Sequence, residues 1–232
     1  MKIDIPNSWD AVTLREFQAV TKLFKEAEPK LETLKGNKKQ RFQFELECAI
    51  ISTISGADMD DILNLHNGAH IALMNTLGFL SEPITGKVQT KAKVNGRRYY
   101  FEKDAKKITG GQWITIMHFL EDEDKIDQNL HNLLACFAFD VKWFSKKYNG
   151  SEHNRIAEDM LELPVSFVKP LTDFFLSDWV NSVKNMAVYL GIKGKQLKRR
   201  AEKELARSKA STVGSTRSTG SRTVGMIYDH IT

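Results

Sequence analysis

The sequence is poor in the residues that build disulfide scaffolds and thiol-based sites. Its 232 residues include two cysteines, Cys48 and Cys136, and five prolines. Each cysteine stands in an apolar, helix-like stretch with no second cysteine or histidine at metal-ligand spacing. We therefore expect two buried thiols rather than a disulfide or a metal pair. This cysteine usage is typical of a reducing, intracellular site of synthesis.

Long apolar runs are also missing. The first ten residues contain no apolar core of the length that a signal peptide needs, and no later stretch approaches the ~20 apolar residues of a membrane span. We expect a protein that makes no membrane contact. It should stay in the cell that makes it, or in a particle assembled there.

Motifs that carry enzymatic chemistry are absent as well. The sequence has no G-x-x-x-x-G-K-[ST], H-E-x-x-H, G-x-S-x-G or C-x-x-C pattern. His66 and His70 share a metal-ligand spacing, but no third ligand is near them in the sequence, so we expect solvent-facing or N-cap histidines. The acidic run at residues 121–124 is interpreted as favourable charge before a helix start. The sequence predicts no enzyme activity, no metal and no cofactor.

Most of residues 1–192 have the apolar spacing of amphipathic helices. Thr13-x-x-Glu16 is a capping box before a helix that we expect to end near Pro29. The apolar stripe of this first helix consists of Leu14, Phe17, Val20 and Phe24. Further helices are predicted over residues 38–55, 58–65, 70–80, 109–120, 126–148, 151–163 and 164–190, the last with a kink or restart at Pro170.

Residues 84–101 interrupt the helical pattern. Residues 88–94 alternate between apolar and polar, Asn95-Gly96 is a strong hairpin turn signal, and residues 97–101 form a second strand. Such a ribbon is marginal unless it lies on the helical body or pairs with another chain. The predicted fold class is mainly α: a multi-helix domain over residues 1–192, with one inserted β-hairpin and an extended basic C-terminal arm.

The positive charge is concentrated at one end of the chain. Residues 193–232 carry a net charge of +7, whereas residues 1–192 carry −2. Residues 193–209, here called the basic segment, have a helical pattern. Residues 210–232, here called the arm, begin with a Ser/Thr/Gly-rich stretch that has little to bury and end in an apolar terminal peptide. We expect the arm to be a flexible spacer whose apolar end binds a partner.

Two groups of residues in these segments are candidate partner-binding residues. Those of the basic segment are Lys198, Arg199, Arg200, Lys203 and Arg207. They fit a solvated helix, docking on an acidic protein surface, or phosphate contacts with nucleic acid. Those of the terminal peptide are Val224, Met226, Ile227, Tyr228 and Ile231. They fit strand addition to a partner's sheet, anchors in a partner's groove, or a frayed chain end.

Several short motifs resemble a group of phage proteins. The matching stretches are Ile5-Pro-Asn-Ser-Trp-Asp-Ala-Val-Thr13 with Phe17, Thr109-Gly-Gly-Gln-Trp113, Tyr148-Asn-Gly, Leu161-Glu-Leu-Pro-Val165 and Phe174-Phe-Leu176. They are similar to small helical proteins encoded among the morphogenesis genes of phages that infect Bacteroidetes, including crAss-like phages. Some of these proteins are described as tail-assembly chaperone-like. The resemblance covers residues 3–180 and carries no catalytic residues.

The resemblance implies a non-enzymatic role in building a virion. The first hypothesis is a virion component, a tail or neck adaptor that binds neighbouring virion proteins through its hairpin and arm and forms a homo-oligomeric ring. The second is an assembly chaperone that is absent from the finished particle. The third is an accessory protein that binds nucleic acid through the basic segment. We favour the first, because an arm with an apolar end gains most from a permanent partner.

Overall fold

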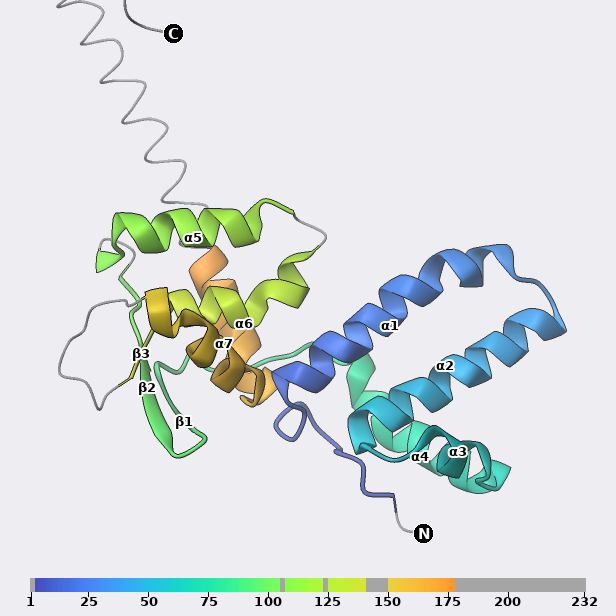
Figure 1. The fold of residues 1–232 in the computed structure, drawn as a ribbon. Coiled ribbons are helices and arrows are strands. Elements are labelled where there is room, and N and C mark those ends of the chain that lie inside the picture. Colours follow the sequence, from blue (N-terminus) through green and yellow to red (C-terminus); the bar gives the residue numbers. More distant parts are fainter. Residues whose placement is uncertain (1–2, 105–106, 123–124, 141–149, 178–232) are drawn as a thin grey trace, which may run out of the picture. The chain divides into compact units, whose positions relative to one another are not determined.

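The computed structural model describes residues 3–104, 107–122, 125–140 and 150–177 (Figure 1), all within a compact unit that spans Met1–Val180. These residues are mainly helical and include a small three-stranded antiparallel sheet, so the predicted fold class is confirmed. The predicted helix over residues 193–209 and the arm lie outside the described residues.

Helices come first along the chain. They are α1 (Leu14–Thr33), α2 (Asn37–Ser55), α3 (Met59–Leu63), α4 (Asn67–Thr76) and the short 3-10 helix η1 (Leu77–Ser81). The strands β1 (Lys91–Val94) and β2 (Arg97–Phe101) follow, and then α5 (Gly110–Leu120), α6 (Ile126–Phe137) and β3 (Ala138–Asp140). The short 3-10 helix η4 (Gly150–Glu152) leads into α7 (His153–Leu161), and residues 165–177 form a further helix.

The first helix begins as predicted but continues further. The Thr13 side chain accepts from the Glu16 backbone N–H while the Glu16 carboxylate accepts from the Thr13 N–H, which is the predicted capping box. The predicted end near Pro29 is wrong, because α1 runs through this proline to Thr33. The Lys30 carbonyl closes the last turn by accepting from the Leu34 N–H and the Thr33 hydroxyl.

The hairpin is confirmed, with the turn at the predicted residues. Asn95 and Gly96 have φ angles of 47° and 72°, which the Asn-Gly pair tolerates and a two-residue hairpin turn requires. The paired strands are shorter than predicted, because β1 begins only at Lys91. One face of the hairpin is buried on the helical body through Val94, Tyr99 and Phe101.

A third strand replaces the middle of a predicted helix. The sequence predicts one helix over residues 126–148, but α6 ends at Phe137 and Ala138–Asp140 pairs with β2. Phe139 lies opposite Tyr100, and Phe101 lies opposite Ala138. The apolar residues of α6 continue into residues 138–140 at helical spacing. The sequence pattern therefore predicted a helix where the structure has a strand. Pairing with β2, a contact distant in sequence, determines the conformation.

Smaller corrections concern helix ends further along the chain. The predicted helix over residues 151–163 is shorter, because α7 begins at His153, after η4 and with Glu152 as its N-cap, and ends at Leu161. The predicted helix over residues 70–80 begins earlier, at Asn67, and tightens into η1 after Thr76. Pro170 does not interrupt the helix over residues 165–177.

Two apolar clusters form the core of the part of the chain that the structure describes. The first combines the sheet with α5, α6, α7 and residues 165–177, and its fully buried side chains include Tyr99, Phe101 and Leu134. The second combines α2 and α3 with the segment before α1 and with η1. The helix α1 contributes to both, because Leu14 belongs to the first cluster and Val20 to the second.

A backbone seam lies where the two clusters meet. The Leu14 N–H donates to the Leu163 carbonyl at 2.8 Å, and the Val165 N–H donates to the Val12 carbonyl at 2.9 Å. Beside this seam the Arg15 guanidinium bridges exposed carboxylates of α7 and the residue that follows it. The chain before α1 is thereby tied to the chain before the helix over residues 165–177.

The helix α5 offers two isoleucines for a matched test of the core. Ile116 is 1% exposed, whereas Ile114 on the same helix is 71% exposed. We expect Ile116→Ala to lower the free energy of unfolding by about 2–5 kcal/mol. Ile114→Ala should change it by less than about 0.5 kcal/mol. Urea unfolding of the two variants measures both values, and equal losses would contradict the orientation of α5.

Candidate functional site

All ten candidate partner-binding residues lie outside the described residues. The structure therefore does not test whether they come together. The described part of the chain offers three places to examine for function: a cysteine–histidine contact, a buried carboxylate and a surface groove along α1.

Both cysteines are free, buried thiols, as predicted. Burial raises the pKa of the Cys136 thiol to about 12. Burial also raises the pKa of Cys48, and the nearby carboxylates of Glu47 and Glu45 add to this. Both side chains are consequently thiols rather than thiolates at neutral pH, so they are poor nucleophiles.

The two histidines proposed as surface or N-cap residues differ from each other. His66 is exposed and occupies the N-cap position of α4, although its side chain makes no capping bond. His70 is buried, which corrects the prediction of a solvent-facing or capping residue. Its Nε2 lies 3.7 Å from Cys48 Sγ and 3.9 Å from a Glu47 carboxylate oxygen. Both neighbours lie next to the same ring nitrogen of His70. In a catalytic triad the nucleophile and the carboxylate contact different ring nitrogens, so this contact is not a triad.

The most concentrated polar interaction in the described residues surrounds Asp159 of α7, whose side chain is only 7% exposed. Asn95 Nδ2 and Arg97 Nη1 each donate to its carboxylate at 2.9 Å. The Tyr99 hydroxyl donates to the same carboxylate. Asn95 is in the hairpin turn and the other two donors are on β2, so α7 holds the hairpin through one buried group.

Arg155, one turn before Asp159, completes this cluster. Its Nη1 donates to the Tyr99 oxygen at 3.1 Å, and its Nη2 donates to Glu152 at 3.2 Å and lies 3.9 Å from Asp140 of β3. The guanidinium therefore links α7 to both β2 and β3. We call Asn95, Arg97, Tyr99, Arg155 and Asp159 the hairpin latch.

The latch changes the acidity of its two central groups. Burial alone would raise the pKa of Asp159, but the hydrogen bonds from Asn95, Tyr99 and Arg97 outweigh it and hold that pKa below its ordinary value. Burial, together with the hydrogen bond to Asp159, raises the pKa of Tyr99 to about 12. The carboxylate is charged and its donors are engaged within the fold. The latch is therefore suited to hold the sheet rather than to transfer a proton.

This cluster was not predicted from the sequence. The available signals were the same-face spacing of Arg97 and Tyr99 on a strand and the four-residue spacing of Arg155 and Asp159 on a helix. Neither signal shows that the two pairs meet, because about sixty residues separate them in the sequence.

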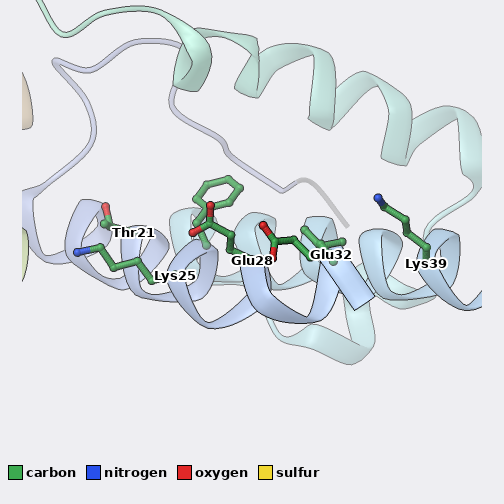
Figure 2. Close-up of a pocket in the computed structure, with 7 residues that line it drawn as sticks. Thr21, Lys25, Glu28, Glu32 and Lys39 are labelled. Atoms are coloured by element: carbon green, nitrogen blue, oxygen red, sulfur yellow. The ribbon is translucent and has the colours of Figure 1, made fainter. Parts of the chain in front are cut away.

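An open groove of about 540 Å³ runs along α1 (Figure 2). We call it the α1 groove. Lys39 of α2 lines one end, and the rest is lined by Thr21, Phe24, Lys25, Glu28, Leu31 and Glu32 of α1. Figure 2 shows the labelled α1 side chains along one side of the helix, as expected for steps of three and four residues.

The α1 groove combines apolar surface with two acidic and two basic side chains. Phe24, which the sequence places on an inward stripe, is 47% exposed, so that prediction is wrong. Lys25 lies 3.9 Å from Asp127 of α6, which offsets its charge. Glu28 and Glu32 make no ion pair with any residue in the described ranges. An open surface of this kind suits contact with a protein segment better than it suits a small-molecule site, which is usually concave and buries most of its ligand.

Asp159→Asn tests the latch. The substitution removes the charge that compensates Arg97 and leaves buried donors poorly matched, so we expect the free energy of unfolding to fall by on the order of 3 kcal/mol. The matched control is Glu158→Gln, next to it on α7. The Glu158 side chain is 67% exposed and pairs with Arg15, so the control should cost less than about 1 kcal/mol. Urea unfolding at neutral pH measures both, and equal effects would contradict the structural weight given to Asp159.

Tyr99→Phe gives a pH-dependent test. The pKa of Tyr99 is raised from 10.0 to about 12 in the fold. Above pH 10 the unfolded chain therefore loses this proton while the folded protein keeps it, and stability falls until the pH passes about 12. Tyr99→Phe removes this contribution. The stability difference between the natural protein and the variant should shrink between pH 10 and 12 in denaturant titrations, and a constant difference would contradict the assignment.

Comparisons with known proteins give no relative from which function can be carried over. No family model, no curated protein and no solved structure matches this chain. In the part of the chain that the structure describes, no helix is long and apolar enough to cross a membrane, and no group of three potential metal ligands is present.

Proposed function

We propose that the protein is a non-enzymatic structural component of a bacteriophage particle, a helical tail or neck adaptor that binds neighbouring virion proteins. The observation that carries the proposal is the division of the chain. A body with a net charge of −2 precedes a +7 region that ends in an apolar peptide. Together with the resemblance of residues 3–180 to phage morphogenesis proteins, this division favours a subunit that holds its neighbours through a terminal extension.

The hairpin is packed on the helical body, so in this proposal the arm makes most of the contacts with neighbouring virion proteins. One face of the hairpin is buried in the first core cluster, and the latch fixes its turn to α7. Among the described residues, what remains for a partner is the opposite face of the hairpin and the outer edge of β1, where Lys91 and Lys93 are exposed. Lysines on an edge strand disfavour indiscriminate strand pairing. The hairpin edge is therefore a secondary contact in this proposal.

A ring is the assembly that the proposal favours. A subunit that donates an arm to one neighbour and receives an arm from another makes head-to-tail contacts, and such contacts close into a ring when the rotation permits. The virion is the proposed location, after synthesis in the cytoplasm of the host bacterium. Neither a cofactor nor a metal is part of the proposal.

The resemblance also supports a second candidate, a tail-assembly chaperone that leaves before the particle is complete. The arm would then hold a client protein transiently. Contact of the basic segment with nucleic acid is a third candidate, supported by its charge alone. The three candidates differ in whether the protein is present in finished particles and in what the arm binds.

Deletion of residues 210–232 tests the proposed function. We expect the truncated protein to keep its fold, because the deleted arm begins with a Ser/Thr/Gly-rich stretch that has little to bury, but to be lost from particles. The measurement is the amount of the protein in particles purified from infected cells that express only the truncated form. Its thermal unfolding, compared with that of the full chain, controls for loss of structure.

Incorporation at the natural level would contradict the role of the arm. Absence of the full-length protein from particles, despite its expression in the same cells, would contradict the structural role and favour the chaperone.

A further inference from the structure

We propose that the outer face of the three-stranded sheet binds single-stranded nucleic acid. The outer face is defined as Lys91 and Lys93 of β1, Arg98 and Tyr100 of β2, and Phe139 of β3. The inference goes beyond the proposed function, because it gives the described body a ligand of its own, on a surface separate from the basic segment and the arm. It rests on the alternation of side chains, the strand register and the charge of this face.

Alternation along the strands separates the outer face from the core. Successive side chains of a strand point to opposite faces, so residues two apart share a face. Tyr99 and Phe101 are buried and belong to the first core cluster. Lys91, Lys93 and Arg98 have the opposite orientation and are exposed. The sheet therefore has one face in the core and one face that carries cations.

The strand register places the side chains of the outer face next to one another. Lys93 lies opposite Arg98 in the pairing of β1 with β2. Tyr100 lies between Lys91 on one side and Phe139 on the other. Side chains that lie directly opposite in an antiparallel pair have Cβ atoms about 5 Å apart. One row of the face is therefore a lysine, a tyrosine and a phenylalanine, and the next row is a pair of cations.

The fold does not neutralise the cations of the outer face. Lys91, Lys93 and Arg98 make no ion pair with any residue in the described ranges. Glu102, the first carboxylate after β2, lies 3.5 Å from Lys107, which offsets its charge. Three such cations on one face attract an anionic partner.

The aromatic rings decide among anionic partners. Tyr100 and Phe139 are both partly exposed. Unpaired bases stack on aromatic side chains while cations contact the phosphates, and sheets with aromatic rings act as such platforms in domains that bind single strands. A duplex keeps its bases stacked inside the helix, and an acidic peptide has no bases. Rings beside unpaired cations therefore favour single-stranded nucleic acid.

Four full-length variants test the outer face. The charge variant is Lys93→Glu with Arg98→Glu. Its control is Lys35→Glu with Lys38→Glu, which makes the same change in charge at exposed residues where α1 is joined to α2. The ring variants are Tyr100→Leu, which removes the aromatic ring and keeps an apolar side chain, and Tyr100→Phe, which keeps the ring. All four retain the basic segment, so any contribution that it makes to binding is the same in every protein compared.

Binding is measured by fluorescence anisotropy at one low salt concentration with three labelled probes. The probes are an oligothymidine of about 16 nucleotides, a duplex of the same length and a polyglutamate peptide. The single strand tests the proposal, and the other two represent the competing anionic partners. Circular dichroism and thermal unfolding of each variant confirm that it is folded.

We expect the natural protein, the control and Tyr100→Phe to bind the single strand with similar affinity. The charge variant should bind it about tenfold or more weakly, because repulsion replaces two phosphate contacts. Tyr100→Leu should bind the single strand about fivefold or more weakly, because it loses the stacking of one base. The same variant should bind the duplex as the natural protein does, because a duplex offers no free base.

Five results would overturn the proposal. The first two are a natural protein that does not bind the single strand and a charge variant that binds it like the control. The next two are a Tyr100→Leu variant that binds it like the natural protein, or that loses the single strand and the duplex equally. The fifth is tighter binding of polyglutamate than of the single strand, which would assign the face to an acidic protein segment. None of these measurements involves particles, so the proposed function stands or fails separately.

Discussion

The buried carboxylate of Asp159 connects α7 to the β-hairpin, and the packing of the sheet on the helices depends on it. A buried aspartate is stable only when donors replace the water that it loses, and here the donors are Asn95, Arg97 and Tyr99 of the hairpin. A two-stranded hairpin alone is marginal in water. The latch, the third strand and the buried face of β2 together make this hairpin part of the core.

Features with local causes were predictable from the sequence. The capping box at Thr13 and the Asn95-Gly96 turn both depend on residues within a few positions of one another. Features with distant causes were not. The strand β3 exists because β2 is beside it, and the latch joins residues about sixty positions apart. Phe24 continues an apolar stripe on α1 yet lies on the surface, because the stripe pattern does not show where the packing partner ends.

Some candidate binding surfaces were suggested by the sequence, and others were found only in the structure. Charge counting located the basic segment and the arm, and the structure does not describe either. The structure added the α1 groove, whose acidic pair no periodicity argument had separated from an ordinary solvated helix face. The buried carboxylate of Asp159 is engaged by donors within the fold, so it supports the structure rather than a reaction.

Quantitative mass spectrometry of purified phage particles tests the central claim most directly, by comparing the amount of this protein with that of the major capsid protein. The account predicts detection at a fixed copy number that matches a closed ring, about six or twelve per particle. Absence from particles, with clear expression in the infected cells, would contradict a structural role.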